Sequence, residues 1–309
     1  MLNVKRLAVF RAVVRAGSIS AAARQLHISQ PAVTKTVRLL EEEIGWPLFV
    51  RVSGRLKLTP EAEDLLTGVE RMFGSVGALQ QLAEEIRGGF SGSVSVATVT
   101  MLSPTLVAQT VRRFHQQYPR VRFDIRALPT RYVLEAVGTC QVDVGIVDSP
   151  AADADMEVVE LCRSEVGCVL PANHPLASRK RLGPKDIAPH TLISFSRETF
   201  TGWQLFSALH DARSGSQVTF TVNNAHTAYA LVQAGVGIAI VDSFPIYTGG
   251  FNDLVIRPFR PLIQTKPHAA FSRSHAVPTI ARKFVEMLRV TTNELIKASD
   301  GMLKPPDSG

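Results

Sequence analysis

Apolar and polar positions at the start of the chain follow a helical period. Leu7, Phe10 and Val14 lie at i, i+3 and i+7, which places them on one face of a helix. Gly17 is expected to end this helix, because glycine tolerates the left-handed conformation of a C-terminal cap. A second short helix, SAAARQLHI, follows, and its residues Leu26 and Ile28 are predicted to point back into the core.

A third helix is predicted over residues 30–43. Ser29 is a good N-cap for it, and Pro31 falls in its first turn, where the missing N–H costs nothing. Two short helices, a tight turn and a third helix form a helix-turn-helix. The third helix would be the recognition helix, whose first residues reach base edges in the major groove of DNA.

The outward residues of this third helix are candidates for reading bases. Gln30 can pair bidentately with adenine, and Thr34 can hydrogen-bond a base or touch a thymine methyl. Lys35 and Arg38 can read guanine or hold phosphate, and their residue types leave both roles open. The predicted DNA-contacting residues are Ser29, Gln30, Pro31, Thr34, Lys35, Arg38, Arg51 and Arg55.

Two short runs joined by a Ser53-Gly54 turn predict a β-hairpin after the third helix. Arg51 precedes the turn, and Arg55 and Lys57 follow it. A hairpin that carries cations beside a recognition helix is a wing that grips the DNA backbone or minor groove. The alternative is a basic solvated face on an ordinary three-helix unit.

Positive charge is concentrated in this N-terminal segment. Residues 1–58 contain ten Lys or Arg against three Glu, a balance of +7, which equals the formal net charge of the whole 309-residue chain. A module that binds a polyanion requires such a concentration.

A long helix is predicted from Pro60 to Arg87, followed by a glycine-rich hinge at residues 88–92. Its apolar positions step by four and three, as in a coiled-coil seam, which predicts pairing with a second copy of the chain. Pairing would hold two DNA-binding modules at a fixed spacing. The alternative is a core helix packed on its own chain. The seam positions are Leu65, Val69, Met72, Val76, Leu79, Ala83 and Ile86.

Strand-like and helix-like segments alternate through the rest of the chain, which predicts an α/β fold with helices covering parallel sheets. The strand-like runs SVSVATVT, VRFDIRAL and VDVGIVD belong to a first unit, and EVGCVLP, QVTFTV and GVGIAIVD to a second. A final helix is expected over about 277–297. Crossovers near residues 162–165 and 264–270 would join two lobes around a cleft.

The predicted organisation has three folded parts and a tail. A winged helix-turn-helix covers 1–59, a dimerisation helix 60–88, an effector-binding domain 89–300 and a disordered tail 301–309. Within the effector-binding domain, lobe I is expected at about 92–162 and 269–300, and lobe II at about 163–268.

Polar residues follow the predicted strands at the edge where open α/β sheets bind ligands. Asp148 and Asp242 end two apolar strands and could hold an ammonium group, although a helix cap or a hinge hydrogen bond explains each equally well. Helix starts, or Arg131 and Arg197, could hold a carboxylate. The predicted effector-contacting residues are Thr98, Thr100, Met101, Ser103, Pro129, Thr130, Arg131, Asp148, Ser196, Thr199, Asn224, His226, Thr227 and Asp242.

The run AGSISAAARQLHISQPAVTKTVRLLEEEIGWPLFVRVSGRLKLTPEA resembles the DNA-binding region of LysR-type transcriptional regulators. QPAVTK is similar to that family's recognition helix, and LF.R....LT to its wing. Thr34-Lys35 replaces a more usual Ser-Arg, and Ala62 stands where glycine is common. The resemblance implies an effector domain similar to type 2 periplasmic binding proteins, and a dimer of dimers.

The pattern LPxxxxLEAV…DVGIVD…HTAxxLVxAGVGIAIVD is similar to regulators of opine and lysine metabolism within that family. This resemblance implies an amino-acid-like or opine-like effector. The wider LysR-type resemblance implies a homodimer or homotetramer that binds double-stranded promoter DNA and RNA polymerase. The three sparse cysteines suit a reducing compartment such as the cytoplasm, no His/Cys cluster has zinc spacing, and no cofactor or metal is expected.

Other classes of protein fit the sequence less well. No apolar run reaches the ~18 residues that span a bilayer, and the sequence has no P-loop, GxGxxG, nucleophile elbow or HExxH motif. Cys140, Cys162 and Cys168 are expected to be buried thiols, with a redox switch of the last two as the alternative. A plain small-molecule-binding protein leaves the basic module unexplained, and an architectural DNA binder leaves the cleft unexplained.

Overall fold

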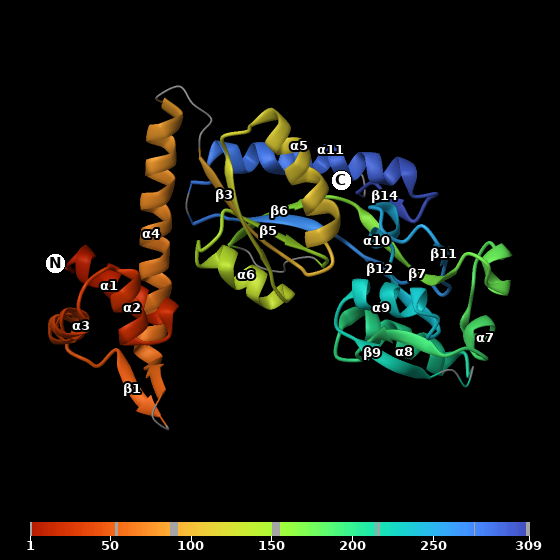
Figure 1. Ribbon diagram of the computed structural model, residues 1–309, viewed down its shortest axis with the longest axis horizontal. Coiled ribbons are helices and arrows are strands. Elements are labelled where there is room, and N and C mark those ends of the chain that lie inside the picture. The colour runs from red at the N-terminus through yellow and green to blue at the C-terminus, as the bar shows by residue number, and fades with distance from the viewer. Residues whose placement is uncertain are drawn as a thin grey trace. The chain divides into compact units, whose positions relative to one another are not determined.

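The computed structural model describes residues 2–52, 55–86, 92–149, 155–213, 215, 217–274 and 276–306. The chain forms two compact units, one made mainly of Met1–Gln80 and the other of most of Gln81–Gly309 (Figure 1). In the described residues, every helix is too short or too polar to cross a membrane.

Three helices, α1 (Val4–Ala16), α2 (Ile19–Gln25) and α3 (Gln30–Ile44), open the first unit. Gly17 ends α1 at φ +70° and Ser29 caps α3, as the sequence predicts. The prediction for Ile28 is wrong, because its side chain is 42% exposed. The preceding residue, His27, has a left-handed backbone with φ 54°, and it turns the chain away from the core.

The predicted wing is a hairpin of β1 (Phe49–Val52) and β2 (Arg55–Leu58). The strands are antiparallel, with Val52 opposite Arg55. The turn predicted at residues 53–54 lies outside the described residues.

The long helix α4 (Pro60–Ile86) uses its apolar stripe in two ways. Its first half packs on its own chain, since Leu65, Val69 and Met72 join the cluster that contains Leu7 and Phe10. The stripe then continues along α4 on residues that are exposed to solvent, Val76 at 41% and Leu79 at 65%. Packing on the same chain therefore accounts for the first half of the seam only. The predicted hinge falls almost wholly on residues 87–91, outside the described part of the chain.

A buried carboxylate fixes α4 to α1. Glu70 is 2% exposed and receives charge-assisted hydrogen bonds from Arg11 Nε at 2.9 Å and from Arg15 Nε and Nη2 at 3.0 and 2.9 Å. Such a carboxylate stabilises the fold only while its partners are in place.

Glu70→Ala is therefore expected to lower the free energy of unfolding of the N-terminal unit by about 2–3 kcal/mol, because two arginines lose their partner. The arginines are partly exposed, so this loss is smaller than for a fully buried ion pair. Urea unfolding followed by Trp46 fluorescence, with Trp203 replaced by Phe, measures this. Glu63→Ala, at an exposed position of the same helix, is the control. Equal effects of the two substitutions would contradict the assignment.

The second unit begins with a five-stranded sheet in the order β4-β3-β5-β13-β6. Strand β3 runs parallel to β4 and β5, whereas β13 is antiparallel to β5 and β6. Helices α5 and α11 cover one face and α6 the other (Figure 1). The elements are β3 (Ser93–Thr98), a π-helical turn (Ser103–Val107), α5 (Ala108–Gln117), β4 (Arg122–Ala127), α6 (Thr130–Gly138), β5 (Val144–Val147), β6 (Met156–Glu160), β13 (His268–Ser272) and α11 (Thr279–Ala298).

The other sheet of this unit has the order β11-β7-β10-β8-β9, and β12 and β14 also pair with β7. Strand β10 is parallel to β8 and antiparallel to β7. The elements are β7 (Arg163–Pro171), a 3₁₀ turn (Pro175–Ser178), α7 (Pro184–Ile187), β8 (Leu192–Phe195), α8 (Phe200–Asp211), β9 (Val218–Val222), α9 (Ala225–Gln233), β10 (Ile238–Asp242), α10 (Phe244–Tyr247), β11 (Leu254–Pro258), β12 (Gln264–Thr265) and β14 (Leu303–Lys304).

The chain crosses between the two sheets three times, twice directly between strands and once more after α11, when β14 pairs with β7. It leaves β6 for β7 at residues 161–162 and leaves β12 for β13 at residues 266–267. Strand residues on the two sides of each direct crossover belong to different sheets, so each direct crossover is a short connection between lobes.

The tail predicted to be disordered over 301–309 is ordered over residues 301–306, so that expectation is wrong there. Leu303 and Lys304 pair with Ser164 and Arg163 of β7. Lys304 Nζ also lies 2.6 Å from the carboxylate of buried Glu165. These contacts hold residues 303 and 304 against β7. Residues 307–309 lie outside the described part of the chain.

Candidate DNA interface and effector cleft

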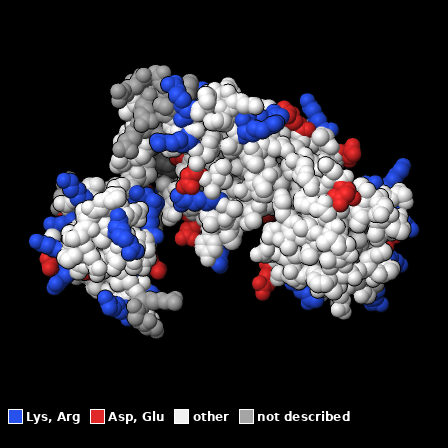
Figure 2. All heavy atoms as spheres, in the orientation of Figure 1, with Lys and Arg blue, Asp and Glu red and all other residues white. Residues whose placement is uncertain are grey.

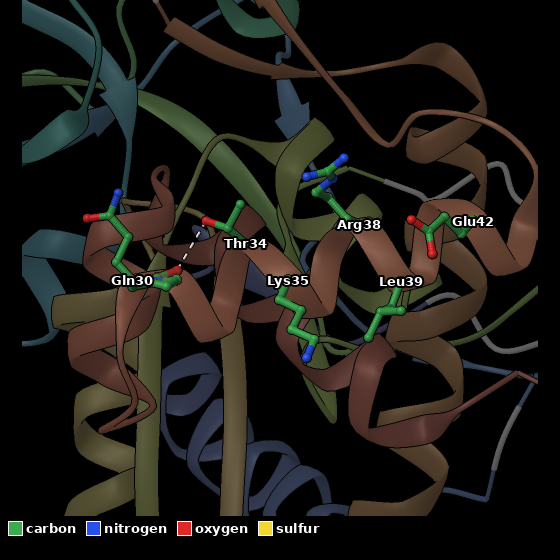
Figure 3. A pocket seen from close by; sticks show the side chains of 7 residues that line it. Gln30, Thr34, Lys35, Arg38, Leu39 and Glu42 are labelled. Atoms are coloured by element: carbon green, nitrogen blue, oxygen red, sulfur yellow. Dashed lines mark hydrogen bonds between the residues drawn. The ribbon is translucent and has the colours of Figure 1, made fainter.

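The outer face of α3 carries the predicted base-reading residues together. Gln30, Thr34 and Arg38 follow one another at every fourth position along one side of the helix, and Lys35 projects from the adjoining side (Figure 3). They line one shallow hollow on this surface. Ser29 and Pro31 act through the helix start, where the Ser29 hydroxyl accepts a hydrogen bond from Ala32 N.

Hydrogen bonds within the unit orient two of these side chains. Ser20 Oγ donates to Gln30 Oε1 at 3.1 Å, which holds the amide in one orientation and leaves Nε2 to donate outward. Thr34 Oγ1 donates to Gln30 O at 3.1 Å, so its proton is used inside the helix. The Thr34 methyl and oxygen lone pairs remain for a DNA base, which favours contact with a thymine methyl.

Cations on this unit divide into paired and unpaired groups. Arg6, Arg11 and Arg15 are paired with Glu43 or Glu70. Lys35, Arg38 and Arg51 have no ion pair among the described residues, and they lie on α3 and the wing. Lys and Arg side chains are spread over the visible face of this unit (Figure 2). Exposed Lys5, Arg24 and Arg71, on α1, α2 and α4, also have no ion pair among the described residues, so the charge that remains for a polyanion includes α3 and the wing but is not confined to them.

Arg55 lies on β2, where the wing is predicted, but its side chain is outside the described residues. Lys57 of the same strand is exposed and pairs across the hairpin with Val50. The hairpin thus places Arg51 and Lys57 on neighbouring strands beside the helix-turn-helix.

A cavity of about 390 Å³ lies in the second unit, where α6, α8 and α9 begin. It receives residues from both sheets, as expected of a cleft between α/β lobes. The predicted effector residues that line it are Thr100, Met101, Pro129, Thr130, Asp148, Thr199, Asn224 and Asp242.

The first turns of α8 and α9 lie at this cavity, and each helix begins with a polar capping residue that lines it. Thr199 caps α8 by accepting from Gly202 N at 3.1 Å, and Asn224 caps α9 by accepting from Thr227 N at 2.9 Å. Gly202 is required here, because a Cβ would stand 2.0 Å from Ser196 O. The remaining N–H groups of these first turns give the cavity wall a partial positive charge.

Six predicted effector residues do not line the cavity, namely Thr98, Ser103, Arg131, Ser196, His226 and Thr227. Thr98 is fully buried. Arg131 stacks on the Tyr132 ring at 4.4 Å, and His226 lies 6.0 Å from the Phe251 ring. Ser196 borders a different hollow, as does Arg197, which stands 3.8 Å over Phe206.

Several residues that line the cavity are not predicted from the sequence. Leu128, Phe200 and Thr201 are not among the predicted effector-contacting residues, and neither is Thr265, the last residue of β12 before the crossover. Apolar residues such as Leu128 and Phe200 carry no chemical signal that separates a cavity wall from a core. The crossover was predicted, and it was the one signal that could have found Thr265.

Two carboxylates define one region of the cavity lining. Asp242 is 3% exposed and its Oδ1 accepts from Thr265 Oγ1 at 3.2 Å, while half-buried Asp148 accepts from Thr130 Oγ1 at 3.2 Å. Burial, followed by the charge of Asp148, raises the pKa of Asp242 to about 7. Burial also raises the pKa of Asp148. The described lining contains no Lys, Arg or His, so the cavity is acidic.

Two of the cysteines are poorly suited to redox chemistry. Cys162 and Cys168 are fully buried. Burial, with a smaller effect of Glu160, raises the pKa of Cys162 to about 12, and burial raises that of Cys168. A thiol held neutral in this way is a weak nucleophile, which favours the buried-thiol interpretation over the redox switch.

Comparison with known families matches both units. Residues 4–63 match the family model described as "Bacterial regulatory helix-turn-helix protein, lysR family". Residues 87–292 match the model described as "LysR substrate binding domain". Between them the two matches span most of the chain.

Relatives and solved structures agree with these matches. The chain is 31% identical to the transcriptional activator protein LysR of Escherichia coli K12, over 84% of this chain and 83% of that protein. It is 27% identical to the octopine catabolism/uptake operon regulatory protein OccR of Rhizobium meliloti, over 92% and 94%. The fold matches full-length CbnR in complex with its target DNA at a TM-score of 0.66 and 22% identity, over 94% and 99%.

Proposed function

Because this chain belongs to the LysR family of transcriptional regulators, we propose that it binds double-stranded promoter DNA through α3 and the wing, and that a small molecule in the 390 Å³ cavity controls this binding. The observation that carries the proposal is the joint presence of an exposed basic recognition surface and a polar cavity in separate units of one chain.

Each DNA-contacting residue has a role in this proposal. Gln30 and Thr34 read base edges, and Arg38, which follows them on the same side of α3, reads a base or the adjacent phosphate. Lys35, Arg51 and Arg55 hold phosphates. Ser29 and Pro31 fix where α3 begins and therefore which residues reach the bases. The spacing of Gln30, Thr34 and Arg38 on one helix face supports this assignment.

The protein acts as a homodimer or homotetramer in this account. Exposed Val76 and Leu79 continue an apolar stripe that is buried in the first half of α4, and a second copy of α4 would cover them. Pairing doubles the DNA-binding surface and sets the distance between two half-sites.

The effector in this account is a small amino-acid-like or opine-like metabolite. The starts of α6, α8 and α9 are suited to an anionic group such as a carboxylate. The relative named for octopine catabolism supports this choice of class. Effector binding would shift the relative positions of the two lobes, and in the cytoplasm this would change how paired modules hold the promoter and contact RNA polymerase.

A selection experiment tests the proposal. Purified protein is mixed with fragments of its own genome and an excess of bulk competitor duplex, with and without a panel of amino acids and opines. Recovery of a small set of fragments, altered by at least one metabolite, is the expected result. Recovery of fragments in proportion to their abundance under every condition would contradict it.

A further inference from the structure

We propose that Asp148 and Asp242 form a two-carboxylate receptor for a protonated nitrogen of the effector, an ammonium or guanidinium, which bridges the two lobes. This inference rests on the proposed function, since it assigns the chemistry of the same cavity. It adds that the cation of the bound effector contacts one aspartate from each lobe and so links the two lobes.

The two carboxylates come from different sheets and meet the same crossover. Asp148 follows β5 in the first sheet, and Asp242 ends β10 in the second. Thr265 donates its hydroxyl to Asp242, and the next residue, Lys266, donates its backbone N–H to Asp148 O at 2.9 Å. Thr265 at the end of β12 and Lys266 in the crossover thus tie both aspartates to the connection between the lobes. A cation between them would attract one lobe to the other.

No cation of the protein neutralises this pair within the described residues. Among the described residues neither aspartate has an ion pair, and both aspartates line the cavity. The hydrogen-bond donors to the Asp242 carboxylate are the Thr265 hydroxyl and the backbone N–H of Asp242, and neither carries a charge. A buried carboxylate without a counter-charge is costly, and a ligand cation would remove that cost.

Other charged groups around Asp242 do not take this role. On β7, Glu165 is engaged with Arg260 at 2.9 Å and Lys304 at 2.6 Å. On α9, the Tyr229 hydroxyl donates to the backbone oxygen of Asp242 at 3.1 Å. Lys266 belongs to the crossover, but it is absent from the described cavity lining. Burial raises the pKa of Asp242 most, and repulsion by the charge of Asp148 raises it further.

A pH dependence follows. With a pKa of about 7, Asp242 carries a proton in roughly half of the ligand-free molecules at neutral pH. The cation requires the carboxylate form, so binding below pH 7 releases that proton to solvent. Affinity is then expected to rise with pH, and to be about tenfold weaker at pH 6 than at pH 8.

Calorimetric titration with four probes tests the charge requirement. L-Arginine carries both cations, L-citrulline has a neutral side chain, Nα-acetyl-L-arginine has a neutral α-nitrogen, and Nα-acetyl-L-citrulline has neither cation. We expect binding by at least one cationic probe and none by the doubly neutral one. The two singly neutral probes distinguish an ammonium from a guanidinium. Equal binding of arginine and Nα-acetyl-L-citrulline, or no binding by any cationic probe, would overturn the proposal.

Asp242→Asn keeps the shape of the side chain and removes its charge. It is expected to weaken binding of the best cationic probe at least tenfold and to abolish proton release, measured by repeating the titration in buffers of different ionisation enthalpy. Asp253→Asn, at an exposed position in the same unit, is the matched control. Unchanged affinity in Asp242→Asn would refute the receptor.

Stability measurements show whether Asp242→Asn is folded. A carboxyl whose pKa is raised on folding stabilises the native state at low pH, and this contribution is lost as pH rises through about 7. The variant is therefore expected to have a Tm at pH 8 no lower than that of the wild type. DNA footprinting is a separate readout: a discrete footprint without cation binding would remove this inference and leave the proposed regulator standing.

Discussion

Leu79→Glu is expected to convert the protein to monomers and to lower its affinity for a DNA fragment with two half-sites by about 100-fold or more. Leu79 is 65% exposed and continues the stripe of α4 beyond the part that packs on its own chain. A carboxylate at a helix-pairing seam would be buried without a partner. A monomer has only one DNA-binding module. In the dimer the second module binds its half-site intramolecularly, and this gain in affinity is lost.

Sedimentation gives the oligomeric state, and fluorescence anisotropy gives the affinity for fragments with one or two half-sites. The two-site affinity should fall to that of the one-site fragment. Arg71→Glu, at an exposed position on α4 away from the stripe, should leave the assembly intact. A Leu79→Glu protein that still sediments as wild type would show that α4 does not pair the chains.

Gln30→Ala is expected to weaken specific binding by about 1–3 kcal/mol and to remove the preference at one base pair. Gln30 opens α3, and Ser20 fixes the orientation of its amide, so its bidentate geometry is set before DNA arrives. Affinity for random duplex should be unchanged, because that affinity comes from phosphate contacts. Binding to a set of fragments with each base pair substituted in turn measures both effects.

A phosphate-binding residue should behave differently. Lys57→Ala, on the wing, is expected to weaken binding to all fragments alike and to reduce the dependence on salt by about one counterion. Gln116→Ala, at an exposed position of α5 in the other unit, is the control and should leave DNA binding unchanged. If Gln30→Ala caused the same uniform loss as Lys57→Ala, Gln30 would be a backbone contact.

The N-terminal module could be predicted closely because its signals are local. A cap at Ser29, a left-handed glycine at Gly17 and the apolar helix faces each fix the backbone within a few residues. Ile28 was misplaced because the left-handed turn at His27 leaves no mark in the hydrophobic pattern. The heptad pattern of α4 marks positions that need covering, but it does not say whether the same chain or a second copy covers them.

The cleft could be predicted only in outline, because it is assembled from segments far apart in the sequence. Strand ends located Asp148 and Asp242, since ligands bind beyond the carboxyl ends of strands in open α/β sheets, and here both sheets bring such ends to one cavity. Arg131 and Arg197 do not line the cavity, and each stacks on an aromatic neighbour, Tyr132 and Phe206, a contact that the sequence pattern does not indicate. The ordered tail depends on the pairing of β14 with β7, a long-range contact that its short sequence does not indicate.

A footprint on the most strongly selected genomic fragment tests the central claim most directly. Insertion of two α3 helices by a paired molecule predicts two protected patches with related sequence, centred about one or a few helical turns of DNA apart. Protection that spreads evenly along the fragment, with no boundary at any protein concentration, would contradict the account.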